Sequence, residues 1–340
     1  MSKLKEVNCP VCMGEEYRIA KNTNIDLHIV KYGDLYSGLK KSQWVICNNC
    51  GFVYQNPRPT VKSLEKFYLD SKYHKHGKDQ FPDSIEFVKF SYWYYQEKID
   101  YLLRQSGLSA GSVFDIGYGH GGMLRVFADK GFKTYGVEAD EEMQKYATKE
   151  LKLKNLLLGV LNSKIENPKV DVIISNHAFE HFFDLHEVMK GITKILKPGG
   201  YILTVIPTYN ESRSNLSRLW MNSAHYNMFT HTTLNRLFNR YGLQEVSHTY
   251  RGWLKEIDDL WHVAKYTGEI NEDNLFKDSP AKVESYLKTW IPLRTLLFSP
   301  FYTSDGKWRR IFALWFAVLR SRKEKKLFAN IVRFLKGNNR

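Results

Sequence analysis

From residue 111 to about residue 250 the sequence alternates short apolar runs with amphipathic segments, and few folds accommodate this pattern. Strands alternating with helices produce βαβ units, which build a parallel sheet with helices on both faces. We therefore predict an α/β fold with a doubly wound, mostly parallel, Rossmann-like sheet. The expected strands are residues 112–116, 134–137, 156–158, 170–175, 201–206 and 243–250, and the expected helices are residues 121–130, 141–151, 185–196 and 232–240.

A glycine-rich turn connects the first strand to the first helix and reads Asp115-Ile116-Gly117-Tyr118-Gly119-His120-Gly121-Gly122. Glycines allow a tight turn and a close approach of a ligand to the backbone. Glu138 ends the next strand, where an acid can accept hydrogen bonds from a ribose diol. Dehydrogenases share such a loop, but here an acid precedes the first glycine. The spacing Asp-x-Gly-x-Gly-x-Gly resembles motif I of class I methyltransferases dependent on S-adenosylmethionine (SAM).

The resemblance continues in order along the chain. The segment 170–176 looks like the fourth strand of that family, and Glu180-His181 follows it as in many members. Leu196-Lys197-Pro198-Gly199-Gly200 looks like the turn into the fifth strand. The resemblance implies that SAM is the cofactor, with Glu138 at its ribose. The other residues implied for the SAM site are Asp115, Gly117 and Gly119 at the methionine end, Val160, Leu161 and Asn162 at the adenine, and Tyr118 and Asn176 as walls. Many relatives carry an acid where Asn162 stands.

All four cysteines fall in two Cys-x-x-Cys pairs, Cys9/Cys12 and Cys47/Cys50. Two such pairs can supply four thiolates to one tetrahedral zinc, which leaves no open position for catalysis. The sequence therefore predicts one structural Zn²⁺. Together with the segment 51–59, this arrangement resembles a bacterial subgroup of methyltransferases that includes sugar C-methyltransferases. Those enzymes carry an extra α/β domain after the core, which is not recognisable here, and this favours an O- or N-methyl acceptor.

Two histidines are the catalytic candidates. His225 lies in a segment that resembles the family's loop over the acceptor, and His181 follows the fourth strand, near His177. A hydroxyl acceptor needs its proton removed during attack, and histidine is the usual base near neutral pH. A structural hydrogen bond or a helix cap is the alternative role for each. A magnesium-dependent mechanism is not expected, because no carboxylate set is placed for the metal.

The composition suggests four regions: a zinc-binding module (1–60), a helical connector (61–110), the SAM-binding core (111–250) and a basic, mostly helical extension (251–340). The net charge is +14, and residues 281–340 alone carry fourteen Lys or Arg against three Asp or Glu. Such a tail suggests an anionic partner. The segment 308–323 reads as a helix with an apolar centre and basic ends, which either contacts a membrane surface or packs on the core.

Three functions remain open. The favoured one is methylation of a small-molecule hydroxyl, on a sugar, sugar nucleotide or surface-glycan precursor, including phosphorylated or lipid-linked forms. The second is an RNA methyltransferase that uses the basic tail, although the segment Asn176-His177-Ala178-Phe179 lacks the Asn/Asp-Pro-Pro-Tyr/Phe signature of many RNA base N-methylases. The third is a non-catalytic scaffold. With no export signal and no apolar run of membrane length, we expect a cytoplasmic protein, or one peripheral at the inner membrane face.

Overall fold

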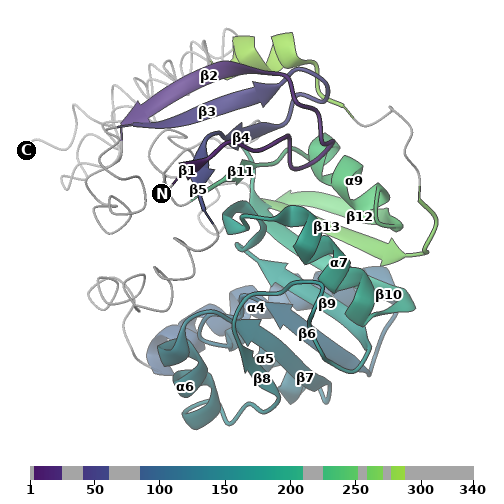
Figure 1. Cartoon of the computed structure of the whole chain (residues 1–340). Helices are drawn as coiled ribbons and strands as arrows, with labels where there is room; N and C mark the ends of the chain where they lie inside the picture. The colour runs from purple at the N-terminus through teal and green to yellow at the C-terminus, as the bar shows by residue number, and fades with distance from the viewer. Residues whose placement is uncertain are drawn as a thin grey trace, which may run out of the picture.

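A computed structural model describes residues 4–24, 41–60, 85–209, 225–251, 259–270 and 277–287. Its main element is a seven-stranded sheet in the order β12-β13-β10-β9-β6-β7-β8 (Figure 1). The parallel strands are β6 (Ser112–Ile116), β7 (Lys133–Glu138), β8 (Leu156–Leu158), β9 (Val170–Asn176) and β10 (Leu196–Pro207). The two antiparallel strands are β12 (Leu243–Arg251) and β13 (Asp259–Tyr266). The expected α/β fold with a mostly parallel sheet is confirmed.

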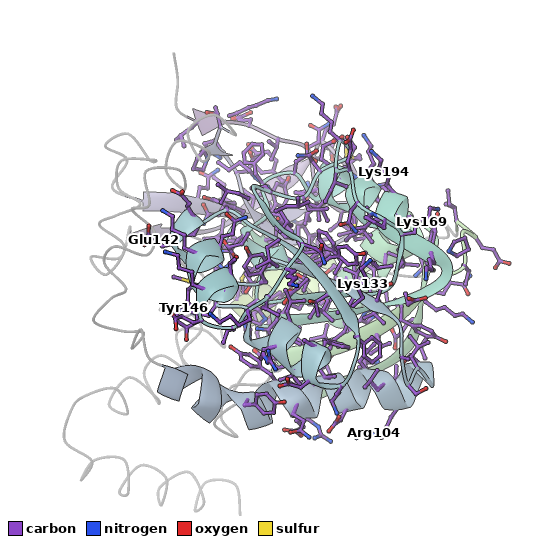
Figure 2. The ribbon with its side chains drawn as sticks, turned by 90° about the horizontal axis from the view of Figure 1, so that it is seen from below. Arg104, Lys133, Glu142, Tyr146, Lys169 and Lys194 are labelled. Atoms are coloured by element: carbon purple, nitrogen blue, oxygen red, sulfur yellow. The ribbon has the colours of Figure 1, made fainter. Side chains whose placement is uncertain are left out.

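Helices cover both faces of this sheet. Apolar residues of α4 (Ile85–Ser106), α5 (Gly122–Asp129) and α6 (Glu141–Lys149) pack on one face. Apolar residues of α7 (Leu185–Ile195) and α9 (His231–Asn239) pack on the other. Charged side chains remain exposed around this sheet, and Figure 2 labels Lys133 at the start of β7, Lys169 before β9 and Lys194 near the end of α7. The doubly wound arrangement therefore follows from the apolar faces that the helices present.

Side-chain caps start the helices where the expected boundaries lie. The carboxylate of Asp140 accepts hydrogen bonds from the backbone N–H groups of Glu142 and Met143 at the start of α6. Asp184 does the same for α7, and Thr230 forms a capping box with Thr233 for α9. Each cap satisfies N–H groups that have no partner within the helix. These three helix starts lie within one residue of those expected from the sequence.

The strand order places a switch point between β6 and β9. The chain proceeds from β6 to β7 and β8 on one side, and then returns to β9 and β10 on the other. Ligands of open α/β sheets bind beyond the carboxyl ends of the strands at such a point. The glycine loop follows β6, and the histidine segment 177–181 follows β9. Both sequence-derived motifs therefore lie at the edge where a ligand is expected.

The N-terminal residues build a smaller antiparallel sheet in the order β11-β4-β3-β2. Its strands are β2 (Tyr17–Asn24), β3 (Lys41–Cys47) and β4 (Val53–Gln55), and β11 (Asn227–Met228) is contributed by the core sequence. A further pair, β1 (Leu4–Lys5) and β5 (Arg58–Pro59), flanks it. The described part of the N-terminal module, residues 4–24 and 41–60, is therefore joined to the core through a shared sheet.

The expectation of a mostly helical segment after residue 250 is wrong for β13. This strand lies between β10 and β12 and pairs with both, so Leu260, Trp261, Val263 and Ala264 are buried. A strand buried on both faces lacks the alternation by which half-exposed strands are recognised. Residues 280–287 are helical, whereas the segment 308–323 lies outside the described residues. No helix within the described ranges is long and apolar enough to span a membrane.

Candidate functional site

The glycine loop leaves its backbone open on one side. Gly117, Gly119 and Gly121 have φ angles of 72°, 53° and 82°, the left-handed region that favours glycine. A Cβ added to Gly119 would meet no atom within 4 Å, whereas one on Gly121 would lie 2.8 Å from the side chain of Leu153. Gly121 is therefore required for packing of the loop on the core. Gly119 borders open space, into which a ligand can pass close to the backbone.

Asp115 precedes this loop and is almost fully buried, with 2% of its surface exposed. Its Oδ1 atom has no hydrogen-bond partner. Burial raises the pKa of the Asp115 carboxyl well above its ordinary value, and the nearby charge of Glu138 adds to the rise. An unpaired carboxylate in this position is stabilised by an incoming cationic group. The ammonium of the SAM methionine moiety has the required charge, so the residue fits that cofactor.

Glu138 ends β7 and connects two loops. Its Oε2 accepts a hydrogen bond from the N–H of Gly119 at 2.9 Å, and its Oε1 accepts from those of Ala139 and Asp140 at 2.8 and 3.0 Å. Burial raises the pKa of this carboxyl, while the three N–H donors lower it. Glu138 therefore ties the glycine loop to the end of the neighbouring strand. The remaining lone pairs of its two oxygens are available to a ribose diol.

The remaining residues expected around the cofactor are placed unequally. The side chain of Tyr118 is buried in the core, where Gly136 leaves room for its ring. Leu161 is also buried, whereas Val160 is half exposed and Asn162 is exposed. The Asn162 amide donates to the carbonyl of Val160, and its Oδ1 accepts from the N–H of Lys164. Asn162 thus shapes its own turn.

Asn176, at the end of β9, is held by a residue that sequence reasoning missed. The ammonium of Lys98, on α4, donates a hydrogen bond to Asn176 Oδ1. Lys98 is fully buried and lies over the ring of Trp261 at 5.8 Å. Burial lowers the pKa of Lys98 to about 7, although Asp259, Glu97 and Glu180 counteract this effect. The contact orients the Asn176 amide at the carboxyl edge of the sheet.

The partly exposed His177 and the buried Glu180 form a second network beside it. His177 Nε2 lies 3.1 Å from Asp259 Oδ2, and its Nδ1 lies 3.6 Å from Glu180 Oε1. Burial opposes the charge of His177, but the two carboxylates prevail and raise its pKa to about 9. Burial likewise opposes ionisation of Glu180, whereas His177 and the neighbouring histidines lower its pKa to about 2. Glu180 therefore stays ionised at neutral pH.

The two candidate catalytic histidines lie together beside this carboxylate. The rings of His181 and His225 meet edge to face with centroids 4.6 Å apart. His181 Nε2 is 3.9 Å from Glu180 Oε1, and ligand atoms of all three side chains lie within 4.8 Å of one another. The N–H of Tyr226 donates to the carbonyl of Glu180 at 2.7 Å, which holds the His225 segment against the turn Phe179–His181 that follows β9. The arrangement provides two imidazoles and an ionised carboxylate for proton transfer.

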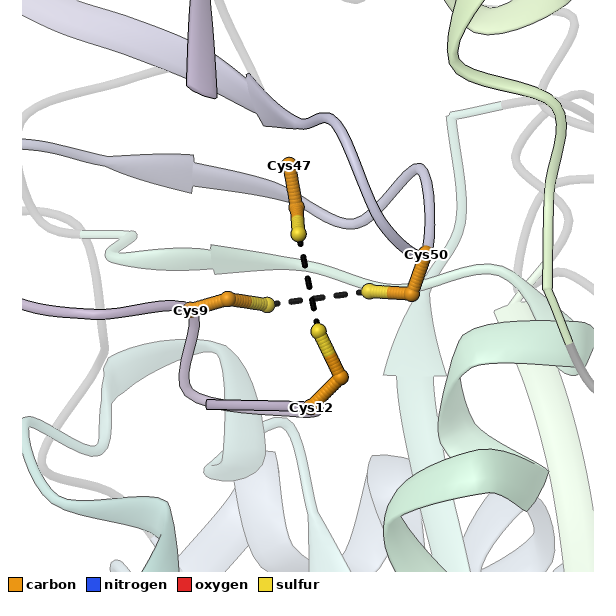
Figure 3. Close-up of side chains that lie close together, drawn as sticks. All are labelled: Cys9, Cys12, Cys47 and Cys50. Atoms are coloured by element: carbon orange, nitrogen blue, oxygen red, sulfur yellow. Dashed lines mark hydrogen bonds between the residues drawn. The ribbon is translucent and has the colours of Figure 1, made fainter. Parts of the chain in front are cut away.

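The four cysteines converge on one centre (Figure 3). The Cys9 and Cys50 sulfurs are 3.6 Å apart, those of Cys12 and Cys47 are 3.5 Å apart, and all four lie within 4.8 Å. These separations are too long for disulfides and near the roughly 3.8 Å edge of a tetrahedron with 2.3 Å zinc–sulfur bonds. Burial also raises the pKa of the Cys9 thiol well above its ordinary value. Four thiolates can therefore gather here only around a cation, and zinc fits the donor set.

The cysteine turns continue into the core of the molecule. Cys9, Cys47 and Cys50 belong to one apolar cluster that includes residues of β6, α7 and α9. The ring of Phe52 lies 5.0 Å from that of Phe229, and Arg240 donates to the carbonyl of Val11 at 3.0 Å. The described part of the N-terminal module is therefore packed on the same face of the sheet as α7 and α9.

The core resembles known methyltransferases in sequence. Residues 90–248 match a family profile described as a methyltransferase domain. Phosphoethanolamine N-methyltransferase 2 of Caenorhabditis elegans is 26% identical over 197 residues, which cover 54% of this chain and 44% of that protein. An uncharacterized methyltransferase of Geobacillus sp. (strain WCH70) is 28% identical over 130 residues, covering 37% of this chain and 61% of that protein. The chain thus spans about half the length of the curated relatives it matches.

Among solved structures, 1,6-didemethyltoxoflavin-N1-methyltransferase of Burkholderia thailandensis, with 1,6-didemethyltoxoflavin and S-adenosylhomocysteine bound, is similar with a TM-score of 0.49. The similarity covers 73% of this chain and all of that one at 15% identity. An amino pentose methyltransferase from Micromonospora echinaspora is similar with a TM-score of 0.42 and 18% identity. This similarity covers 51% of this chain and 92% of that one.

Proposed function

We propose that this chain, in which residues 90–248 match a methyltransferase domain profile, transfers the methyl group of SAM to a hydroxyl of a small molecule. The observation that carries the proposal is the buried, unpartnered carboxylate oxygen of Asp115 beside the open backbone of Gly119. A cationic ligand would stabilise this buried carboxylate, and the open space beside Gly119 leaves room for a large ligand. A non-catalytic scaffold would have no need to retain a buried unpaired charge, which costs stability.

Residues of three strand ends share the binding of SAM in this proposal. Asp115 pairs with the ammonium of the methionine moiety of SAM. The backbone of the glycine loop passes close to the amino-acid part of the same moiety. Glu138, already held by the N–H of Gly119, receives the ribose hydroxyls. Val160 and Asn162, exposed after β8, border the adenine. SAM supplies a methyl group activated by its sulfonium charge, so the protein mainly aligns an acceptor with that methyl.

The acceptor side is assigned to the two histidines. His225 takes the proton of the acceptor hydroxyl as attack proceeds, and His181 lies against its ring. Glu180 stabilises the positive charge that then forms on the imidazole pair, since it stays ionised in a buried position. Asn176, oriented by Lys98, lies at the end of β9 and contributes an amide to the same site. A proton-accepting pair suits an oxygen acceptor, because an amine that is already deprotonated needs no base.

The proposed acceptor class rests on a resemblance of the N-terminal module. Its two cysteine pairs before the core resemble the subgroup that contains sugar methyltransferases, and we propose a sugar, sugar nucleotide or surface-glycan precursor. The zinc is structural in this proposal, because four thiolates complete its coordination. RNA remains the second candidate only through the basic residues 281–340, most of which lie outside the described part of the chain.

Two experiments test the proposal. Calorimetry with SAM and S-adenosylhomocysteine measures cofactor binding, and absence of binding would overturn the assignment. Release of S-adenosylhomocysteine is then assayed with a panel of sugar nucleotides, phosphorylated sugars, phosphoethanolamine and RNA. Turnover with a sugar hydroxyl supports the proposed class, whereas turnover only with the amine or with RNA rejects it while leaving the SAM assignment intact.

A further inference from the structure

The segment that carries His225 belongs to the sheet of the cysteine module. β11 follows His225 directly and pairs antiparallel with β4, placing Asn227 opposite Tyr54 and Met228 opposite Val53. The core holds the same segment from the other side, since the Asn227 amide donates to the carbonyl oxygens of Phe179 and Phe182. The position of His225 is therefore set where the two sheets meet.

Gln55 makes the closest connection between the module and the histidine. Its backbone N–H donates to the carbonyl of Tyr226 at 2.9 Å, and its side-chain amide donates to the carbonyl of His225 at 2.5 Å. Gln55 is fully buried, and His225 is 7% exposed. Two donors from one residue thus hold two successive carbonyls, which restricts rotation of the backbone that carries the imidazole.

The cysteine turns determine where Gln55 lies. Cys47 and Cys50 close the turn that leads into β4, because the N–H of Cys47 donates to the carbonyl of Phe52 and that of Gly51 donates to the carbonyl of Cys47. Gln55 is the last residue of β4, five residues after Cys50. The hydrogen-bonded turn at the sulfur cluster is therefore joined to the His225 carbonyl through the short stretch of chain from Phe52 to Gln55 and the Gln55 amide.

We propose that Gln55 is a positioning residue through which the cysteine module sets the imidazole of His225 for methyl transfer. The proposal rests on the proposed function, in which His225 is the base. It assigns the module a role beyond stability, because loss of the Gln55 amide moves the histidine while the SAM site remains intact. Within the described residues, the hydrogen bonds of Glu138 go to Gly119, Ala139 and Asp140, none of which belongs to the module.

The chain offers a matched control. Gln43 lies in the same sheet, and its side-chain amide also donates to a backbone carbonyl, that of Asn56, at 2.8 Å. It holds β3 to the residue after β4, and among the described residues its side chain makes no hydrogen bond to the histidine segment. Gln43→Leu and Gln55→Leu therefore remove the same kind of hydrogen bond from the same module, and only the second removes one from His225.

The test uses the full chain with histidine labelled for nuclear magnetic resonance. The ring signals of His225 and His181 are assigned by comparison with His225→Gln and His181→Gln. In Gln55→Leu the ring signals of His225 are expected to shift, whereas zinc content and SAM affinity stay at wild-type values. In Gln43→Leu the His225 signals are expected to stay unchanged. Once an acceptor is identified, Gln55→Leu should lower kcat by about 10²-fold, the scale of a displaced catalytic group.

A second variant guards against misfolding. Gln55→Glu keeps the side-chain length but replaces the amide donor with a carboxylate opposite the His225 carbonyl. Unchanged His225 signals in both Gln55 variants, with zinc retained, would overturn the proposal. Loss of zinc or of the fold in both variants would also overturn it, because Gln55 would then hold the module itself together. The ring signals, the zinc content and the SAM affinity are all measured without turnover. A failed search for the acceptor would therefore count against the proposed function alone.

Discussion

The ring of His181, which follows β9, lies edge-on to that of His225, and their centroids are 4.6 Å apart although the residues are separated by 44 positions in sequence. Each approaches from a different sheet: His181 from the seven-stranded core, and His225 from the segment leading into β11. The carboxylate of Glu180 lies within 4.8 Å of a ring nitrogen of each histidine, and 2% of the Glu180 surface is exposed. The proposed base, His225, and its neighbour His181 therefore come from different sheets. Substituting each histidine separately tests which of them acts as the base.

The first prediction separates these roles. His225→Ala should lower turnover with the identified acceptor by about 10²–10⁴-fold, the usual effect of losing a general base, while SAM affinity is unchanged. His181→Ala should have a smaller effect, because it removes the neighbour of the base and not the base itself. The two variants are compared by S-adenosylhomocysteine release and by calorimetry. Full turnover in His225→Ala together with loss in His181→Ala would reverse the assignment.

The second prediction concerns the open side of the glycine loop. Gly119→Val fills the space beside the backbone and should abolish SAM binding in calorimetry. Gly131→Val is its control, because Gly131 also has a positive φ, of 84°, and also has no atom within 4 Å of an added Cβ. Both variants carry comparable backbone strain, of about 1–2 kcal/mol or more. Equal SAM affinity in the two variants would remove Gly119 from the cofactor site.

Local sequence patterns were sufficient for the parallel half of the fold. The strands β6 and β8 match the expected ranges, since each is a short apolar run between helix signals. β13 was missed because Asp259, His262 and Lys265 interrupt its apolar residues and because it enters the sheet antiparallel, outside the βαβ pattern. Its run Leu260-Trp261-His262-Val263-Ala264 was the available signal, since aromatic and β-branched residues are enriched in strands.

The site shows the same division. Asp115, Gly119 and Glu138 were recognisable because their spacing lies within one βαβ unit. The contact between Lys98 and Asn176 joins a helix before the first strand to the end of the fourth parallel one, and no local pattern predicts it. The same holds for Gln55 and His225, which are 170 residues apart. Contacts of this range depend on the three-dimensional packing of modules, which periodicity does not encode.

The third prediction concerns the metal. The purified chain should contain about one zinc, and thiol reagents should react with its four cysteines only after a chelator is added. Cys50→Ser should lose the zinc, because three thiolates and a hydroxyl make a weaker site. Since structural zinc contributes to folding, the chelated protein should unfold at a lower temperature. Four thiols that react at once in the untreated protein would contradict a zinc site.

The fourth prediction is that Asp115 lowers the stability of the SAM-free protein and contributes to SAM binding. A folded-state pKa above the ordinary value means that folding disfavours the carboxylate, so at neutral pH this residue lowers the stability of the SAM-free protein. Asp115→Asn should therefore raise Tm without SAM by a few degrees, since about 1 kcal/mol corresponds to about 2–4 °C for a domain of 150–250 residues. It should also reduce the increase in Tm that SAM produces. A lower Tm in the variant, with a normal response to SAM, would refute this role.

The fifth prediction uses the pH dependence of the network around His177. Its pKa is raised to about 9, because the charges of Asp259 and Glu180 outweigh the effect of burial. A raised pKa stabilises the fold fully below the ordinary value of 6.5, and this stabilisation is lost as pH rises through 9. The free energy of unfolding should therefore decline across that interval. About a third of the His177 side chain is exposed, so solvent screening keeps the decline modest.

His177→Asn isolates this contribution. His177 has a φ angle of 54°, and asparagine tolerates this left-handed conformation, so the substitution removes the titrating ring without adding backbone strain. Lys98 also titrates in this range, since its lowered pKa makes the free energy of unfolding rise with pH above about 7. Both proteins contain Lys98, so its contribution largely cancels when they are compared. Urea unfolding of both proteins at pH 6.5 and pH 9 measures the difference. The decline between these pH values should be smaller in His177→Asn, and an equal decline would place the titrating group elsewhere.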